Sequence, residues 1–328
     1  MAYQQLHCIW TSQSVKLRVK QFQFRVFSIF VEGVDGMQVI EHQKLKPSQN
    51  VRSVVTIGKF DGVHLGHVQI LKRVVERARV LHAIPVAYTF EPHPLKVLIP
   101  HLLTPMISTF DERLRRIEAA GIALTVWARF TTEYASQDPR EFVRSTLRDC
   151  LGAVEIWVGP DFAFGRGRNG TIDLLRQEGE KLGFSVHVMP PLSLAGDVVS
   201  STRVRQAVVA ADFRSAERML GRPYGLCGKV APTAGRWGNP GGCMLLAQQE
   251  LLPPPGLYSA WAISGASVPR PVAAAVSQPV YDGGKSEIAF SLERWSDVVS
   301  SETEIRFVHR LGPIVTIEKS AACPTSRD

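Results

Sequence analysis

The sequence predicts an α/β fold, in which a parallel sheet covered by helices on both faces precedes a small all-β module. Between about residues 50 and 221, short apolar β-branched runs alternate with stretches of helical period, which is typical of a parallel sheet. After Gly221, prolines, glycines and short alternating runs dominate, which favours β-hairpins. The 328 residues suffice for about two domains. We therefore place a domain boundary near residue 222.

The first predicted strand covers Val54 to Ile57, and the next apolar residues recur at helical spacing between Val68 and Leu81. A helix is predicted from Asp138 as N-cap to Gly152. Further strands are predicted at residues 86–90, 124–127, 154–158 and 186–188.

The N-terminal 31 residues contain no Asp or Glu and no secretory cleavage pattern. The run MQVIEHQKLKP, which starts at Met37, is typical of the N-terminus of a protein, so we interpret residues 1–36 as an extension. An organellar presequence is the alternative.

Composition excludes several classes of protein. No apolar run reaches the roughly 18 residues of a membrane-spanning helix. The five cysteines form no CxxC pair, which argues against a zinc site or a disulfide framework and favours the reducing cytoplasm. The formal net charge of +8 favours polyanionic partners, and we expect nucleotide phosphates rather than nucleic acid.

The strongest motif, GKFDGVHLGH, lies between the first strand and its helix and covers residues 58–67. Loops at the carboxyl ends of parallel strands bind ligands, and a helix N-terminus offers free N–H groups to phosphate. His64 and His67 share one face of the first turn, with Gly66 between them. A single histidine here would be an ordinary cap, but this pair within a glycine-containing loop predicts a phosphate site.

A second motif, Ser200-Ser201-Thr202-Arg203-Val204-Arg205, precedes another helical stretch. Its hydroxyls and guanidinium groups could hold a triphosphate. An N-cap followed by surface arginines is the equally simple alternative.

Two further motifs carry aromatic residues. The run GPDFAFGRGRNG, residues 159–170, matches G-x-G-x-x-G but not in the strand–helix context of a dinucleotide fingerprint, so we interpret it as a glycine-hinged loop with Asp161 as a polar anchor beside Phe162. The run TFEPHP starts at Thr89 and predicts an exposed turn, in which Phe90 is either core or ligand wall. No P-loop, nucleophile elbow or HExxH motif occurs. Phosphates bound by His, hydroxyl and Arg side chains, without a P-loop lysine, suggest attack on an α-phosphate.

These four motifs, in this order and spacing, resemble those of the bacterial bifunctional riboflavin kinase/FAD synthetase family over residues 37–221. The resemblance implies a nucleotidyltransferase domain that joins FMN to the AMP moiety of ATP, with Mg²⁺, to give FAD and pyrophosphate. It also implies a catalytic set of His64, His67 and Arg203, and a flavin-facing set of Phe90, Asp161 and Phe162. The implied nucleotide-binding set is Gly58, Phe60, Asp61, Gly62, His64, Gly66, His67, Ser200, Ser201, Thr202 and Arg203.

The match weakens in residues 222–328, which we interpret as a degenerate riboflavin kinase-like β-barrel domain. Where the family carries G-x-P-T-A-N, this chain has Gly238-Asn239-Pro240-Gly241-Gly242-Cys243, so the Thr and Asn that organise Mg²⁺ and nucleotide are missing. Glu287 stands where the resemblance places the kinase base, although it could equally be a surface carboxylate.

The leading hypothesis is therefore an FMN adenylyltransferase whose riboflavin kinase activity is doubtful. Three alternatives remain: an intact bifunctional enzyme, a relative that acts on another phosphorylated acceptor, and a non-catalytic flavin- or nucleotide-binding regulator. The PDFAFG run argues against the second, and the retention of both histidines argues against the third.

Overall fold

A computed structural model describes residues 36–48, 51–101, 105–233, 241–246, 250–264, 268–277, 286–291 and 302–313. Apart from Gly36, the predicted extension at residues 1–36 lies outside these ranges, as do Gly238 to Pro240. None of the helices in the described ranges combines the length and apolar character needed to cross a bilayer.

The first sheet has six strands, and every neighbouring pair is parallel. The predicted strands are confirmed, whereas the edge strand at residues 38–41 was not predicted, because it is short and only one of its four side chains is buried. In spatial order the strands are β1 (Gln38–Glu41), β4 (Leu124–Arg129), β3 (Ile84–Glu91), β2 (Ser53–Ile57), β5 (Ala153–Val158) and β6 (Ser185–Val188).

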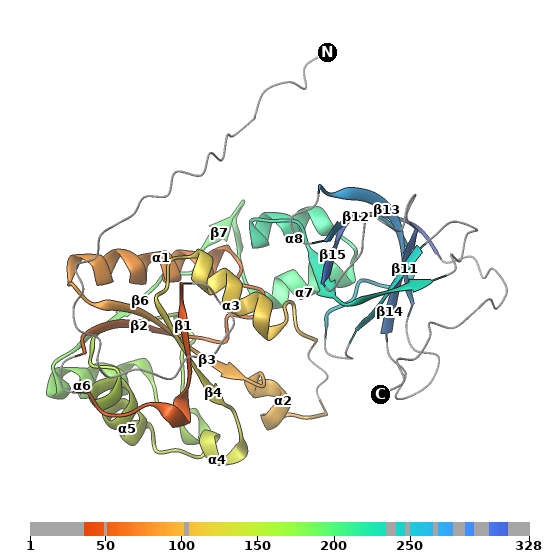
Figure 1. The fold of residues 1–328 in the computed structure, drawn as a ribbon. Helices are drawn as coiled ribbons and strands as arrows, with labels where there is room; N and C mark the ends of the chain where they lie inside the picture. Colours follow the sequence, from red (N-terminus) through yellow and green to blue (C-terminus); the bar gives the residue numbers. More distant parts are fainter. Residues whose placement is uncertain are drawn as a thin grey trace.

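Helices cover both faces of this sheet, as the sequence predicts (Figure 1). On one face lie α1 (Leu65–Val80) and α3 (Phe110–Ala119), which bury Leu71 and Ile117 in one core with Val54 of β2. On the other face, α6 (Ile172–Leu182) and a segment starting with α5 (Pro139–Glu141) form a second core with Val55. Neighbouring side chains of one strand thus point to opposite cores, which explains the continuous apolar runs.

The helix predicted from Asp138 to Gly152 is present but is not α-helical throughout. Asp138 accepts hydrogen bonds from the backbone N–H groups of Arg140 (2.8 Å) and Glu141 (3.3 Å) as its N-cap. After α5 the chain continues as a π-helical segment, Phe142–Cys150. Gly152 ends the segment with φ +56°, and a Cβ on it would lie 1.8 Å from the Val51 carbonyl oxygen. Only glycine fits at this position.

Shorter elements connect these layers. They are two 3₁₀ turns (His42–Lys44 and Arg166–Arg168), α2 (Pro94–Leu98), α4 (Thr132–Ala135), and the hairpin of β7 (Ser193–Leu194) and β8 (Asp197–Val198).

The second sheet is antiparallel and nearly closed, which confirms the predicted barrel-like fold. Its strand order is β10 (Val230–Thr233), β11 (Gly241–Leu246), β14 (Ser286–Ser291), β13 (Arg270–Ser277), β12 (Gly256–Ser264), β15 (Thr303–Gly312) and β9 (Gly225–Gly228).

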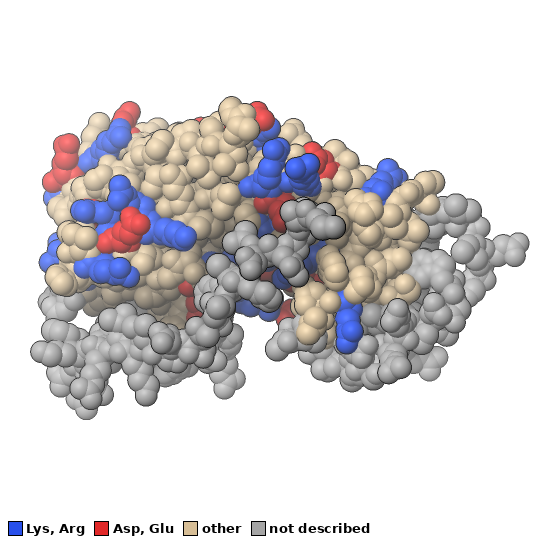
Figure 2. Space-filling model, turned by 90° about the horizontal axis from the view of Figure 1, so that it is seen from above, with Lys and Arg blue, Asp and Glu red and all other residues tan. Residues whose placement is uncertain are grey.

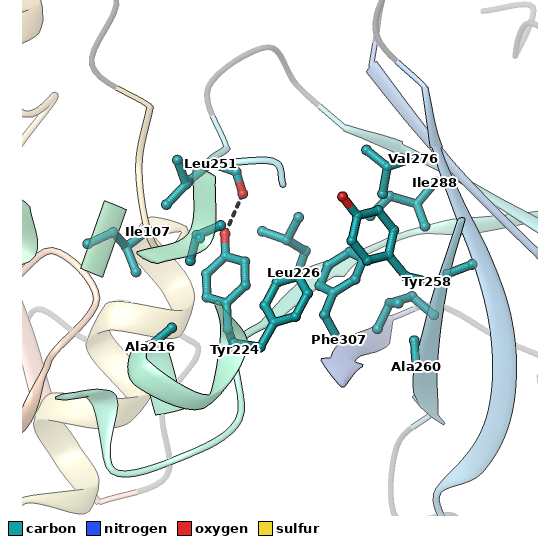
Figure 3. Packing of buried hydrophobic residues seen from close by; sticks show 14 of the residues in the cluster. Ile107, Ala216, Tyr224, Leu226, Leu251, Tyr258, Ala260, Val276, Ile288 and Phe307 are labelled. Atoms are coloured by element: carbon teal, nitrogen blue, oxygen red, sulfur yellow. Dashed lines mark hydrogen bonds between the residues drawn. The ribbon is translucent and has the colours of Figure 1, made fainter. Parts of the chain in front are cut away.

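Two helices that precede the proposed boundary at residue 222, α7 (Ser201–Val209) and α8 (Phe213–Leu220), share a core with the second sheet. Figure 3 shows Tyr224 between Ala216 of α8 and Leu226 of β9, with its hydroxyl donating to the Leu251 carbonyl oxygen. The two parts of the chain therefore meet along a packed apolar junction.

Candidate functional site

The candidate site lies at the carboxyl edge of the parallel sheet. The chain runs outward from β2 through β3 to β4, and then returns to place β5 on the other side of β2. The loops after β2 and β5 therefore leave the sheet in opposite directions, and it is at such a switch point that α/β sheets bind ligands. These two loops are residues 58–64, which hold the first seven residues of the first motif, and residues 159–170, which are the third motif.

The two histidines of the first motif are stacked. His64 is the N-cap of α1, and its Nδ1 accepts a hydrogen bond from the His67 backbone N–H at 3.3 Å. The ring centroids lie 3.7 Å apart with an interplanar angle of 14°. Because Nδ1 of His64 acts as an acceptor, a neutral ring carries its proton on Nε2.

Phe60 and two glycines determine how closely the chain packs around these two rings. Phe60 is buried and packs edge-on against His67, with ring centroids 5.3 Å apart. A Cβ on Gly66 would lie 3.2 Å from the His64 ring, and one on Gly58 would lie 3.0 Å from the Phe60 ring. The prediction that Gly66 admits a phosphate stays a prediction; what the structure shows is that Gly66 leaves room for the His64 imidazole.

Asp61 faces inward. Its carboxylate accepts backbone N–H groups from Ile107 (3.0 Å) and Ser108 (3.3 Å), and it pairs with Arg205 at 2.6 Å. Its carbonyl oxygen accepts the Ser201 hydroxyl at 3.1 Å. The first and second motifs are therefore in direct contact. The sequence suggested that Arg205 binds phosphate, whereas in the structure its guanidinium pairs with Asp61.

The rest of the second motif begins α7. Ser200 is the N-cap and accepts from the Arg203 backbone N–H at 3.3 Å, as the simpler alternative expected. Thr202 is exposed. The Arg203 guanidinium pairs with Asp197 of the β7–β8 hairpin at 2.8 Å. The Asp197 side chain is exposed and that of Arg203 is 38% exposed, so the arginine can exchange Asp197 for a phosphate at a small energetic cost.

Arg113 of α3 connects the loop after β2 with the end of β3. Its side chain is 3% exposed and donates to the carbonyl oxygens of Lys59 (3.1 Å) and Phe90 (2.9 Å). It also pairs with Glu91 at 2.5 Å. Sequence reasoning missed this residue, because it lies outside every motif.

The electrostatics around His64, His67 and His93 favour an anion. The pKa of His64 is lowered to about 4, mainly by burial and in part by the charge of nearby Arg222. Burial likewise lowers the pKa of His67, together with the charges of Lys59 and Arg113. The pKa of His93, the N-cap of α2, falls to about 3 through burial and the same cationic surroundings. At neutral pH these imidazoles are uncharged donors in a positive field.

On the face that Figure 2 shows, Lys and Arg side chains are spread over the half with the six-stranded sheet and gather again near the junction. Few appear on the described part of the second sheet. On this face, the described Lys and Arg side chains therefore lie mainly over the part with the six-stranded sheet.

An aromatic cluster occupies the neighbouring part of the same edge. Phe90 packs against Phe130 and Tyr134, with ring centroids 5.6 and 6.2 Å apart. Phe162 stacks on Phe164 at 5.3 Å. Fully buried Tyr88 and neighbouring Phe142 join the two groups into one cluster.

The structure thus brings Phe90 and Phe162 into one partly buried aromatic cluster. Asp161 is exposed at its rim, where its carbonyl oxygen accepts from Arg168 at 3.4 Å. The sequence did not single out Phe130, Tyr134 or Phe142, because they come from separate segments whose only shared signal is aromatic character.

In the second sheet, Glu287 lies on β14 opposite Leu245 of β11. Cys243, on β11, is buried. Gly242 packs so closely that a Cβ on it would lie 2.5 Å from the Phe290 ring. Strand β11 is therefore apolar and tightly packed around Gly242 and Cys243.

Comparison with known proteins agrees with this geometry. Residues 46–203 match the family model described as FAD synthetase. The chain is 34% identical over 193 residues to the FAD synthetase of Listeria monocytogenes, covering 58% of this chain and 78% of that protein. It is 40% identical over 177 residues to the bifunctional riboflavin kinase/FMN adenylyltransferase of Pseudomonas fluorescens, covering 54% and 57%. The match thus spans little more than half of that bifunctional relative.

A solved structure named macrolide-efflux protein, from Streptococcus pneumoniae, has a TM-score of 0.71 and covers 86% of this chain and 93% of that one. Its sequence identity is 24%, so this likeness concerns the fold, which extends over both sheets. With the four motifs gathered at one edge of the first sheet and a relative matched over most of its length, the chain belongs to the FAD synthetase family.

Proposed function

We propose that this protein is an FMN adenylyltransferase, which transfers AMP from ATP to FMN and releases pyrophosphate. One observation carries the proposal: a loop with two stacked neutral histidines, surrounded by Lys59, Arg113 and Arg222, lies at the same sheet edge as an aromatic cluster. The loop suits a polyphosphate, and the cluster suits the flat isoalloxazine ring. The names of the relatives in the family support this pairing of substrates.

The reaction needs positioning more than acid–base chemistry. An oxygen of the FMN phosphate forms a bond to the α-phosphorus of ATP, and the bond from that phosphorus to the bridging oxygen of the β-phosphate breaks. The nucleophile is already an anion, so no base is required, and pyrophosphate leaves with the bonding electrons. Negative charge builds on the phosphate oxygens, where preorganised donors are most effective.

We assign these donors to the first two motifs. His64 and His67 would donate N–H groups to phosphate oxygens of ATP, and the exposed end of α7 would hold the triphosphate through Thr202 and Arg203. The lowered pKa values of both histidines support this assignment, because a neutral imidazole donates without carrying a desolvated charge. Gly58, Phe60, Asp61 and Gly66 would shape the loop.

We further propose Mg²⁺ as the metal and Phe90, Phe162 and Asp161 as flavin contacts. In the described ranges no group of three or more His, Cys, Asp or Glu side chains could hold a metal. The Asp61 carboxylate is already occupied by Arg205 and backbone N–H groups. We therefore expect Mg²⁺ to enter together with ATP, where it would be held by phosphate oxygens and water and would neutralise phosphate charge. We place the protein in the reducing cytoplasm, since the cysteines of the described ranges form no disulfide.

Chromatography of the flavins formed from FMN, ATP and Mg²⁺ tests the proposal. The wild-type chain should give FAD and pyrophosphate in equal amounts. His67→Ala and His64→Asn should each lower the rate by about 10²-fold, the scale lost with one preorganised donor, and the asparagine retains an N-cap. Exposed His101, replaced by Ala, is the matched control and should leave the rate unchanged.

Binding of FMN and ATP without any FAD would instead indicate a regulator. Adenylylation of another phosphorylated acceptor in preference to FMN would indicate a different substrate, and near-normal turnover in both histidine variants would refute the site.

A further inference from the structure

The loop after β2 has an unusual backbone. Phe60, Gly62 and Val63 have φ values of +51°, +77° and +38°, all in the left-handed region. Glycine accepts this conformation readily, but a β-branched residue such as Val63 is a true outlier there. Backbone strain of this kind persists only where the surrounding structure holds it in place.

Arg222 supplies part of this support. Its guanidinium donates to the carbonyl oxygens of Gly62 (2.7 Å) and Val63 (3.4 Å), and also to that of Leu220 (3.3 Å). The side chain is only 20% exposed, and the Glu112 carboxylate lies 3.9 Å away. One rigid fork therefore binds two consecutive carbonyl groups of the strained segment, which a lysine could not do in the same way.

The other end of this contact belongs to the second sheet. Arg222 follows Gly221, the left-handed C-cap of α8, and precedes Tyr224 by two residues. The Tyr224 carbonyl oxygen accepts from the Phe307 backbone N–H at 2.9 Å, and its ring lies in the junction core (Figure 3). The backbone that carries Arg222 is thus held on both sides by packed structure.

We propose that Arg222 is a positioning residue. It holds the strained loop after β2, residues 58–64, in the conformation that binds phosphate, and it attaches this loop to the second sheet. No motif of the sequence includes it. Its proposed effect on turnover rests on the adenylyltransferase assignment, but its effect on the loop and on ATP binding does not.

Hydrogen–deuterium exchange and calorimetric ATP titration of the full chain test this role directly. In Arg222→Gln, amides of residues 58–67 should exchange at least tenfold faster, whereas those of β5 and β6 should keep their wild-type rates. The Kd for ATP should rise about tenfold or more, the scale of a lost hydrogen bond to a charged group, with Arg222→Lys in between. Arg214 is exposed on α8, so Arg214→Gln is the matched control and should leave both measurements unchanged.

Steady-state kinetics add a readout that a merely structural role would not move. In Arg222→Gln the KM for ATP should rise about tenfold while the KM for FMN stays within twofold, because Arg222 binds carbonyl groups of the loop that carries the histidines. Unchanged loop exchange, or an unchanged Kd for ATP, would overturn the proposal. If Arg222→Gln fails to fold, Arg222→Lys provides the same test.

These outcomes separate the two claims. A wild-type chain that forms no FAD would refute the proposed activity, while exchange and ATP titration would still decide the role of Arg222.

Discussion

Acid should destabilise this protein through His64 in particular. The buried imidazole has its pKa lowered to about 4, whereas in the unfolded chain it returns to about 6.5. Between these two pH values the unfolded state binds more protons than the folded state, so the free energy of unfolding falls as the pH falls. Integrated from pH 7 to pH 5, this single group removes roughly 2 kcal/mol of stability.

Urea unfolding followed by tryptophan fluorescence measures this loss, because Trp127 and Trp157 report on the six-stranded sheet. His64→Asn keeps an N-cap acceptor but cannot titrate, so its loss between pH 7 and pH 5 should be smaller than that of the wild type by roughly 2 kcal/mol. His101→Asn should follow the wild type. Equal losses in the wild type and His64→Asn would refute the reasoning.

Three further predictions concern residues that the structure explains. Asp61→Asn should lower the free energy of unfolding by about 3–5 kcal/mol in urea titrations, because it leaves a mostly buried arginine unpaired; a change under 1 kcal/mol would contradict this. Gly152→Ala should lower it by at least ~2 kcal/mol or prevent folding, since its Cβ would overlap the Val51 carbonyl, and a wild-type Tm would argue against that contact. Riboflavin with ATP and Mg²⁺ should give little or no FMN, because Gly241 and Cys243 cannot organise the metal; FMN formed as fast as FAD would disprove it.

Much of the fold follows from the sequence, because a parallel sheet buried on both faces leaves continuous apolar runs. Val54 and Val55 show this, since each belongs to a different core. Strand β1 carries a weaker signal, because only Ile40 of its residues is buried. The sharing of a core between α7, α8 and the second sheet could not be predicted, because a helical apolar period shows that a face is buried but not against what.

The site was predictable only in part. The stacked histidines lie three residues apart, so one local run contains both. Arg113 and Arg222 reach the same loop from α3 and from the end of α8, and nothing in their local sequence indicates the carbonyl groups that they bind. Arg205 shows the opposite error, since its position in a hydroxyl-rich run suggested a phosphate, whereas its partner is Asp61, 144 residues away in the sequence.

The fate of labelled phosphorus tests the central claim most directly. With FMN and Mg²⁺, [α-³²P]ATP should place its label in the flavin product, while the label of [γ-³²P]ATP should appear in pyrophosphate and not in any flavin. Transfer of the γ-label to a flavin, or the absence of α-label from the flavin fraction, would contradict adenylyl transfer at this site.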